Sequence, residues 1–434
     1  MDRGPLRPGR MTRAPRIHVV GAGLSGLSAA VTLAGRGLKV ILSEAAPQAG
    51  GRCRSYHDAR LGMVIDNGNH LVLSGNVAVQ RYLRAIGAED RLAGPPHAEF
   101  PFLDLRDGTR WTLRPNDGVV PWWVLSAARR VPGTALRDYA ALARLARRHP
   151  GKRIDEVLPC QGPLWERLLR PVLVSVLNTA PEEGSAELAG AVMRESLARG
   201  GAASRPLVAT PSLDAAFIEP ALAYLRGAGA EIRMGRRLRG LEIDGDRVAA
   251  LDFADGAEPL GAQDRAILAL PPWVVAPMLP GLAVPDSFRA IVNAHFRLAP
   301  PPGTPPITGV VGGVADWVFA FADRVSVTIS AADHLLERDP DALLATLWEE
   351  VAVALNLPPE PSPGRIVKEK RATFAATPEQ DMRRPPGRTA FANLALAGDW
   401  TATGLPATIE GALRSGETAA ALALSGLLVA QNPL

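Results

Sequence analysis

Residues 17–26 read IHVVGAGLSG, and this stretch decides the fold. The apolar run at 17–20 predicts a buried strand, and residues 24–36 have the spacing of a helix. Between them lies a GxGxxG turn, and Glu44 follows the next apolar run, 38–43. This order of strand, glycine turn, helix, strand and acid is that of a βαβ unit that binds a dinucleotide.

Each glycine of the turn answers a physical requirement. Gly21 allows a tight turn, Gly23 lets the backbone touch a pyrophosphate, and Gly26 lets the helix pack closely on the strand. The helix start offers free N–H groups and the positive end of the helix dipole to the phosphates. Glu44 can accept hydrogen bonds from both hydroxyls of a ribose. The cofactor-binding residues expected from this unit are Gly21, Gly23, Leu24, Ser25, Gly26, Glu44 and Ala45.

The same segment has a second interpretation, because residues 17–35 contain no charged side chain and basic residues precede them. A signal peptide or a membrane span would have this property. The four glycines of the segment, together with polar residues such as His18 and Ser25, favour the βα unit. Residues 1–15, rich in Arg, Pro and Gly, predict a flexible leader.

Composition limits the remaining classes of function. A length of 434 residues suggests two or three domains, and 47% hydrophobic residues can fill large cores. The net charge of +4 is small for this length and favours neither nucleic acid nor an acidic substrate. With only Cys53 and Cys160, a disulfide framework is not expected, and a reducing cytoplasm fits. No Cys/His cluster has metal-ligand spacing, so no metal site is expected.

Two further motifs carry chemistry. Gly50 and Gly51, followed by Arg52, would bring backbone and a fixed cation onto the same pyrophosphate. Near the C-terminus an apolar run ends at Asp399, and a helix is predicted from Thr408 to 424. Asp399 would accept a hydrogen bond from a flavin ribityl hydroxyl. The helix start would stabilise negative charge on the reduced flavin ring.

The rest of the chain predicts a mixed architecture. Helical spacing dominates 74–206, and a further helix over 213–226 is interrupted at Pro220. A β-meander is expected to begin at 231–234, with hairpin turns at residues 244–245 and 255–256. Asp339 should cap a helix that starts at Pro340 and runs to residue 356.

The three motifs, in this order, resemble the GG-doublet flavoproteins, which include amine oxidases, protoporphyrinogen oxidase and carotenoid desaturases. The resemblance spans nearly the whole chain. Residues 66–71, DNGNHL, and the block 398–416 resemble more closely the hydroxysqualene dehydroxylases, the squalene-associated, desaturase-like branch. This implies an FAD-dependent oxidoreductase of squalene and hopanoid biosynthesis, in which reduced FAD replaces an allylic hydroxyl of hydroxysqualene with hydrogen.

The family also implies how the chain is divided. An α/β, Rossmann-like FAD-binding domain would comprise 16–75, 207–275 and 390–434. A discontinuous α+β substrate domain would comprise 76–206 and 276–389. No cysteine lies in the C-terminal block where the family carries a flavin tether, so the FAD should be non-covalent. The further cofactor-binding residues implied are Gly68, Asn69, His70, Leu238, Pro271, Gly398, Asp399, Pro406, Thr408, Ile409, Glu410 and Ala412.

His70 and Asp66 are the candidate catalytic residues. In this fold the segment after the Arg52 loop runs beside the flavin ring, so His70 could protonate a departing hydroxyl, oriented by Asp66. The alternative for His70 is a hydrogen bond to the cofactor or the backbone. The alternative for Asp66 is ordinary turn formation, since Asp-Asn-Gly is turn chemistry.

Other functions of the same fold remain open. A carotenoid or phytoene-type desaturase also handles a long polyene and is the second choice. Amine oxidation is disfavoured, because Thr408 stands where amine oxidases carry an aromatic residue and none of the four tyrosines lies in 398–416. A prenyl-protein carrier without FAD is disfavoured by the intact Glu44 and Asp399.

The expected partner is a long C30 isoprenoid, which resides in lipid. Trp122 and Trp123 precede a predicted basic amphipathic helix that reaches Arg148, so this region could lie on an anionic membrane. A buried Trp pair beside a solvated basic face is the alternative. The expected location is the cytoplasm, with peripheral contact at the membrane. Only one dinucleotide fingerprint occurs, so the sequence indicates no NAD(P)H domain and does not identify the electron donor.

Overall fold

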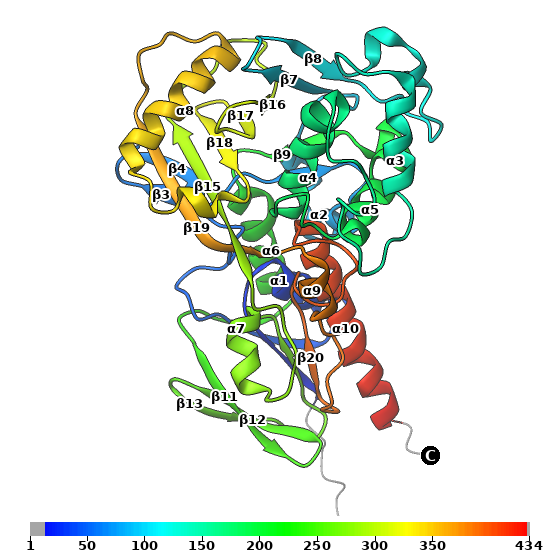
Figure 1. Ribbon diagram of the computed structural model, residues 1–434. Coiled ribbons are helices and arrows are strands. Elements are labelled where there is room, and N and C mark those ends of the chain that lie inside the picture. The colour runs from blue at the N-terminus through cyan, green and yellow to red at the C-terminus, as the bar shows by residue number, and fades with distance from the viewer. Residues whose placement is uncertain (1–13, 432–434) are drawn as a thin grey trace, which may run out of the picture.

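A five-stranded parallel sheet forms the centre of the lower half of the molecule (Figure 1). The computed structural model describes residues 14–431, so most of the predicted leader lies outside the described residues. The sheet order is β10 (Glu231–Arg233), β2 (Lys39–Ser43), β1 (Arg16–Val20), β14 (Arg265–Leu268), β20 (Leu394–Leu396). Segments more than 350 residues apart in the sequence therefore share one sheet.

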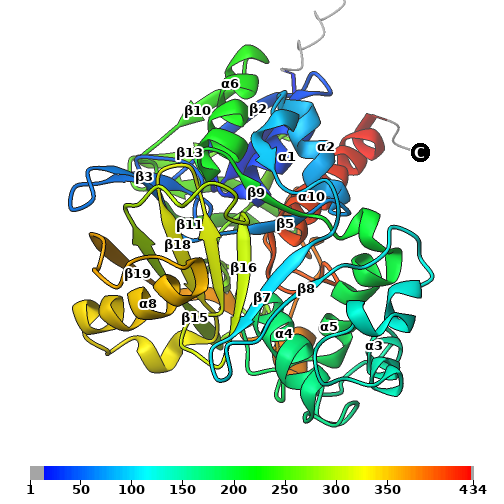
Figure 2. The ribbon, with the colours of Figure 1, turned by 90° about the horizontal axis from the view of Figure 1, so that it is seen from above.

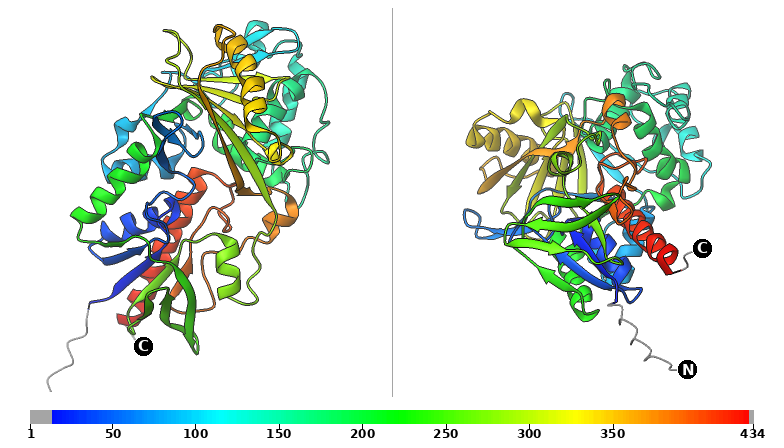
Figure 3. Two further views of the ribbon diagram at one scale, coloured as in Figure 1. Left: turned by 90° about the vertical axis from the view of Figure 1, so that its left-hand side faces the viewer. Right: turned by 90° about the horizontal axis from the view of Figure 1, so that it is seen from below.

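Two helices lie side by side against this sheet (Figure 3). They are α1 (Leu24–Ala34) and α10 (Ile409–Gln431). Their close approach needs Gly416, because a Cβ there would come within 2.2 Å of the Ser25 carbonyl oxygen. The Ser28 hydroxyl donates to the Leu413 carbonyl across the contact at 2.8 Å. The βα unit and the C-terminal helix are thus confirmed, and the helix ends seven residues later than predicted.

The predicted β-meander needs one correction. Residues 231–233 form β10, which pairs in parallel with β2 and so belongs to the central sheet. The antiparallel meander consists of β11 (Leu238–Asp244), β12 (Arg247–Phe253) and β13 (Gly256–Pro259). Both hairpin turns occur where they were predicted. Short hairpin signals are local, whereas the partner of residues 231–233 lies about 190 residues earlier in the chain.

The upper half is built on a seven-stranded sheet, seen from above in Figure 2. Its order is β19 (Gly364–Phe374), β15 (Phe288–Phe296), β18 (Val325–Ile329), β17 (Trp317–Ala320), β16 (Ile307–Val311), β7 (Phe100–Asp104), β8 (Arg110–Leu113). The strands β7 and β8 correct the prediction that helices dominate 74–206. They join the sheet through the parallel pairing of β7 with β16.

Helices cover the upper sheet (Figure 2). On one side lies α8 (Pro340–Leu355), whose start is capped as predicted: the Asp339 carboxylate accepts from the Ala342 N–H at 2.8 Å. On the other side lie α3 (Ala140–Leu145), α4 (Arg170–Leu177) and α5 (Ala186–Glu195). Strand alternation directs Trp317 and Phe319 away from the valines that pack on α8.

Shorter elements connect the halves. They are β3 (Ser55–Asp58), β4 (Met63–Asp66), β5 (Leu71–Leu73), α2 (Val77–Ile86), β6 (Leu92–Ala93), β9 (Pro206–Ala209), α6 (Glu219–Gly227), α7 (Pro272–Val275) and α9 (Pro378–Met382). The helix predicted to be interrupted near Pro220 is not broken there, because a π-helical stretch at Asp214–Ile218 continues directly into α6. Within residues 14–431, no helix is long and apolar enough to cross a membrane.

Candidate active site

The three glycines of the first glycine loop have different surroundings: two are packed tightly and one borders open space. Gly21 has a φ of +104°, and a Cβ there would lie 2.3 Å from the Ala269 carbonyl oxygen. A Cβ at Gly26 would lie 1.8 Å from the Gly21 carbonyl oxygen. A Cβ at Gly23, in contrast, would meet nothing within 4 Å. The protein itself therefore requires glycine at 21 and 26, while Gly23 borders free space.

The second glycine loop lies beside the first. The Gly50 N–H donates to the Ala22 carbonyl at 2.8 Å, and a Cβ at Gly51 would come within 3.4 Å of the Gly23 Cα. No side chain caps α1, and its first turn, which begins at Leu24 and Ser25, contains no acid. Two bare backbone loops and an uncapped helix start form a cradle that suits a diphosphate.

Glu44 holds the first loop in shape. Its carboxylate accepts from the Ala22 N–H at 2.7 Å and from the Ala46 N–H, just beyond Ala45, at 2.8 Å. An ionised carboxylate has about four acceptor positions. Glu44 can thus accept further hydrogen bonds while it keeps the loop in place.

Arg52 and Asp399 connect the second and third motifs. The Arg52 guanidinium donates to both oxygens of Asp399 at 2.7 Å, and also to the Ala372 carbonyl at 2.6 Å. The sequence had placed Arg52 on a pyrophosphate, but here it holds a carboxylate. The Arg52 side chain is 44% exposed, so a polar ligand can still reach the pair.

The start of α10 carries most of the C-terminal motif. The Thr408 hydroxyl accepts from the Gly411 N–H at 3.0 Å, and the Ser415 hydroxyl accepts from the Gly398 N–H at 2.9 Å. Gly398 is packed tightly, because a Cβ there would lie within 2.5 Å of the Trp400 indole. Around the start of this helix lie Pro406, Thr408, Ile409 and Ala412.

Glu410 has a structural role that the sequence did not indicate. Its buried carboxylate accepts from the N–H groups of Ala78 and Val79, both at 3.0 Å, and so caps the start of α2. Arg414 donates to the same carboxylate at 2.8 Å. A carboxylate engaged in this way links the starts of two helices as a cap, and a contact between Glu410 and the cofactor stays a prediction.

Asp66 is not the partner of His70. Its carboxylate accepts from the Ser55 hydroxyl at 2.6 Å, the Leu213 N–H at 2.9 Å and the Arg324 guanidinium at 2.8 Å. The side chains of Asp66 and Arg324 are each 3% exposed. The carboxylate therefore ties β4 to distant parts of the chain, a role beyond that of the turn considered in the sequence.

The segment after Asp66 is fixed against the upper sheet. The Asn69 amide donates to the Thr328 hydroxyl at 3.1 Å, and the Asn67 amide donates to the Glu369 carboxylate at 3.2 Å. A Cβ at Gly68 would be 3.3 Å from the Asn293 side-chain nitrogen. The polar side chains of β15, β18 and β19 thus fix the path of residues 67–69.

His70 follows directly and is half-buried, without a hydrogen-bond partner in residues 14–431. Burial lowers the pKa of its imidazole to about 4, against the opposing effect of the Asp66 carboxylate and with a smaller contribution from the positive charge of Arg52. The imidazole is therefore neutral near pH 7. A neutral imidazole can donate one hydrogen bond but is a weak acid.

Three residues that the sequence analysis missed shape this region. The buried Arg384 guanidinium donates to the Asp399 carbonyl at 3.1 Å, to the Thr401 carbonyl at 2.6 Å and to the Thr403 hydroxyl at 2.7 Å. It holds the loop between β20 and α10. Arg324 pairs with Asp66, and His295 shares a 2.8 Å hydrogen bond with Ser326. Only long-range pairing brings these residues to the site, so no local pattern marks them.

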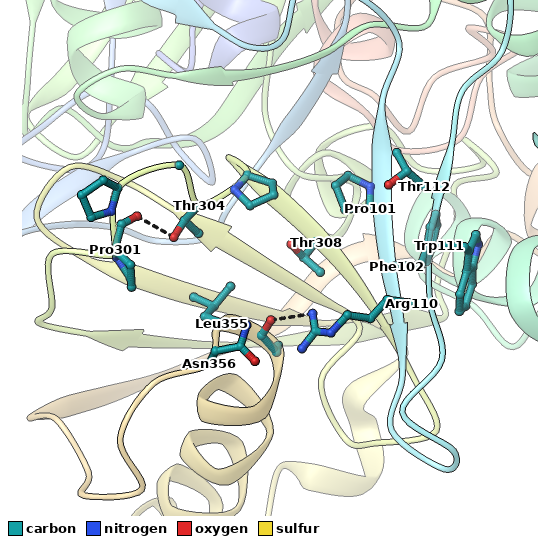
Figure 4. A pocket seen from close by; sticks show the side chains of 14 residues that line it. Pro101, Phe102, Arg110, Trp111, Thr112, Pro301, Thr304, Thr308, Leu355 and Asn356 are labelled. Carbon is teal, nitrogen blue, oxygen red and sulfur yellow. Dashed lines mark hydrogen bonds between the residues drawn. The ribbon is translucent and has the colours of Figure 1, made fainter.

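Two further expected residues, Leu238 and Pro271, lie next to β11 and α7. Leu238 is buried at the start of β11, and Pro271 is exposed just before α7. A pocket of about 520 Å³ lies between β8, residues 301–305 and the end of α8 (Figure 4), where Arg110 donates to the Ala354 carbonyl at 2.9 Å. None of the expected site residues lines this pocket.

Within the described residues no group of His, Cys, Asp or Glu could hold a metal ion.

Comparison with known proteins gives a consistent result. The model of the flavin-containing amine oxidoreductase family matches residues 24–424. Hydroxysqualene dehydroxylase of Rhodopseudomonas palustris is 52% identical over 94% of this chain and 98% of its own length. Proteins of the same name from Sinorhizobium fredii and Zymomonas mobilis are 51% and 50% identical over 94% of this chain and 98% and 99% of their own.

Solved structures show the same fold at low identity. Cyclohexylamine oxidase from Brevibacterium oxydans superposes with a TM-score of 0.67 over 95% of this chain and 99% of its own, at 17% identity. An oxidoreductase from Methanosarcina mazei gives 0.69 over 93% and 99%, at 14% identity. The chain is a flavin-dependent oxidoreductase with a Rossmann-like domain and a substrate domain, and it belongs to the hydroxysqualene dehydroxylases of the flavin-containing amine oxidoreductase family.

Proposed function

We propose that the chain binds FAD non-covalently and reduces hydroxysqualene to squalene. One observation carries the proposal: three proteins named hydroxysqualene dehydroxylase are at least 50% identical to it over 94% of its length. In the net reaction, the alcohol and FADH2 would give the deoxygenated product, FAD and water, so that reduced FAD accounts for both the hydride and the proton of the reaction. Bound reduced FAD supplies the hydride for this step.

The cradle supports FAD as the specific flavin. The space beside Gly23 and the uncapped start of α1 fit a diphosphate, and Glu44 has acceptor positions left for a ribose. Leu238, at the start of β11, would contact the adenine. Arg52 and Asp399 would hold the ribityl chain at the other end. A flavin that lacks the adenosine half would leave Glu44 without a ligand.

The two cysteines support non-covalent binding. Cys53 follows the second glycine loop but is buried, and burial raises the pKa of its thiol well above the ordinary value. The thiolate is the nucleophilic form, so this cysteine is not activated for a covalent bond. Cys160 lies in the substrate half, and burial raises the pKa of its thiol to about 11.

We assign the apolar wall of the substrate site to the large buried cluster of the substrate half, which includes a residue next to the cofactor motifs. Trp317 and Phe319 of the upper sheet belong to one apolar cluster with Trp400, which follows Asp399 directly. Such a wall fits a C30 chain and excludes water from the carbon that loses the hydroxyl. The same wall contains no charged pair that would bind an amine or an acid.

His70 is assigned to the departing hydroxyl. Its pKa of about 4 makes the imidazole neutral, so we assign it a hydrogen bond that orients the hydroxyl rather than full protonation. The carboxylate of Asp66 is engaged elsewhere and has no part in this step. The proposed location is the cytoplasmic side of a membrane, with peripheral contact, because the substrate resides in lipid.

Two measurements test this function. Acid denaturation of the purified protein should release a soluble flavin that chromatography identifies as FAD. Removal of the protein from its host should lead to accumulation of hydroxysqualene in the extracted lipid. Retention of the flavin on the denatured chain would contradict non-covalent binding. Accumulation of a less desaturated carotenoid precursor would instead favour a desaturase.

A further inference from the structure

An exposed apolar surface lies on the substrate half, away from the cofactor cradle. Residues 119–136 contribute five of the eleven large hydrophobic side chains that are exposed among the described residues. We call this set the apolar cap; it consists of Val119, Val120, Trp122, Leu125 and Leu136. Trp122 is 65% exposed, whereas its neighbour Trp123 is 4% exposed. Scattered exposed hydrophobic residues are normal, but a concentration of this kind marks an interaction site.

Buried contacts beneath the apolar cap fix its backbone. Trp123 packs edge-to-face on Tyr139, with ring centroids 5.3 Å apart and an interplanar angle of 89°. The Asn116 amide donates to the Val120 carbonyl at 2.9 Å, and its oxygen accepts from the Trp123 N–H at 3.2 Å. The predicted amphipathic helix is broken into short pieces: 3₁₀ turns at Trp122–Leu125, Ala127–Arg129 and Leu136–Tyr139 precede the helix α3. These turns direct one tryptophan inward and the other outward.

Positive charge accompanies the apolar cap. Residues 118–137 contain Arg129, Arg130 and Arg137 and no acidic residue. The exposed side chains of Arg129, Arg144 and Arg147 have no ion-pair partner within residues 14–431. Arg148 is paired with Glu187 at 2.8 Å and contributes less. A region that combines exposed apolar side chains with arginines that lack an ion-pair partner is complementary to anionic lipid headgroups over acyl chains.

The apolar cap is also continuous with the interior of the substrate half. Trp123 and Tyr139 belong to the same apolar cluster as Leu173 of α4, Trp317 of the upper sheet and Trp400 beside the cofactor motif. The base of the apolar cap therefore packs into the apolar core of the substrate half.

We propose that the apolar cap docks the protein onto an anionic lipid bilayer, with Trp122 and Leu125 inserted at the interface. Tryptophan favours this depth because its ring is apolar and its N–H is polar. The biological reason for such docking rests on the proposed function, because hydroxysqualene would be taken from lipid. The docking itself follows from the side chains, so the two can be tested separately.

The test is flotation of the flavin-loaded protein with phosphatidylcholine vesicles that contain or lack phosphatidylglycerol. Binding should need the anionic lipid and should weaken in high salt. Trp122→Ala with Leu125→Ala should weaken binding by about 10-fold or more. Arg129→Gln and Arg147→Gln should each weaken it by about fivefold. Trp273→Ala is the matched control, since Trp273 is an exposed tryptophan on α7 and its loss should leave binding unchanged.

Measurement of turnover in detergent micelles separates membrane docking from the proposed reduction of hydroxysqualene. The Trp122→Ala, Leu125→Ala variant should convert hydroxysqualene in detergent micelles at the wild-type rate while it binds vesicles poorly. Vesicle binding that is equal in this variant and in wild type would overturn the proposal. So would a wild-type protein that ignores anionic vesicles but self-associates through the apolar cap. Absence of turnover with normal vesicle binding would contradict only the function.

Discussion

Two aspartates near strand ends, Asp66 at the end of β4 and Asp399 just after β20, have similar partners and different surroundings. Asp66 pairs with Arg324 at 2.8 Å, and Asp399 pairs with Arg52 at 2.7 Å. The Arg324 side chain is 3% exposed, whereas the Arg52 side chain is 44% exposed. The first pair is sealed within the scaffold, and the second borders the cofactor cradle. The exposure of the arginine therefore distinguishes an Asp–Arg pair that holds the scaffold from one that can contact a ligand.

The largest expected effect concerns this pair of aspartates. Asp66→Ala leaves Arg324 as an uncompensated buried charge, so the free energy of unfolding should fall by about 3–5 kcal/mol. Asp399→Ala leaves a partly exposed arginine and should cost about 1 kcal/mol or less. Denaturant unfolding of the two apoproteins measures the difference.

Flavin retention should show the reverse order. The Asp399→Ala protein should lose flavin on gel filtration, measured as the ratio of flavin to protein absorbance, because in the proposed site the ribityl hydroxyl would lose its acceptor. The folded fraction of the Asp66→Ala protein should keep its flavin. Equal destabilisation of the two apoproteins would remove the distinction between the two aspartates.

Two glycines of the first loop give a second comparison between loss of stability and loss of flavin binding. Gly26→Ala puts a Cβ 1.8 Å from a carbonyl oxygen, so we expect about 3 kcal/mol of lost stability. Gly23→Leu meets open space in the apoprotein and should leave its melting temperature nearly unchanged. It should nevertheless weaken FAD binding by about 100-fold or more, or about 2.7 kcal/mol, because the side chain fills the diphosphate cradle. A Gly23→Leu protein with a full flavin complement would show that the cradle is misassigned.

Replacement of His70 tests whether a side chain without a hydrogen-bond partner in the protein acts on the substrate. A general acid typically contributes ~10²–10⁴-fold. Because the imidazole is neutral, we expect His70→Ala to slow single-turnover oxidation of the reduced enzyme by about 10- to 100-fold, or about 1.4–2.7 kcal/mol. His70→Asn keeps a hydrogen-bond donor and should recover part of the rate. A normal rate with normal FAD content would dismiss the role.

The smallest effect is the pH dependence of stability from His295. Burial, aided by the positive charge of Arg324, lowers the pKa of its imidazole to about 3, below the ordinary 6.5. Between these values the unfolded chain binds a proton that the folded chain does not, so acid favours unfolding. The stability of wild type relative to His295→Asn should fall by about 1.3 kcal/mol when the pH is lowered from 5.5 to 4.5. Parallel pH profiles of the two proteins would contradict the buried neutral imidazole.

Much of the cofactor half could be predicted from the sequence because its requirements are local. The spacing of Gly21 and Gly26 follows from sterics within one βαβ unit, and the structure reproduces both contacts. The helix capped by Asp339 was predicted for the same reason. Where a segment pairs with a distant one, local pattern fails: β7 joins β16 about 200 residues later, and β10 returns to β2.

The site residues follow the same rule. Glu410 stands in a cofactor motif, yet its carboxylate caps α2, whose start lies about 330 residues earlier. Arg384 has no motif at all, yet it holds the loop that carries Asp399. Neither role could be derived from neighbouring residues, because each is fixed by a partner that only the folded chain brings near.

The direction of electron flow is the central claim, and one anaerobic single-turnover measurement tests it most directly. The protein-bound flavin is photoreduced, one equivalent of hydroxysqualene is added, and flavin absorbance and extracted lipid are followed together. We predict full reoxidation of the flavin with one squalene formed per flavin. A flavin that stays reduced, in a protein whose oxidised form dehydrogenates a carotenoid precursor, would contradict the account.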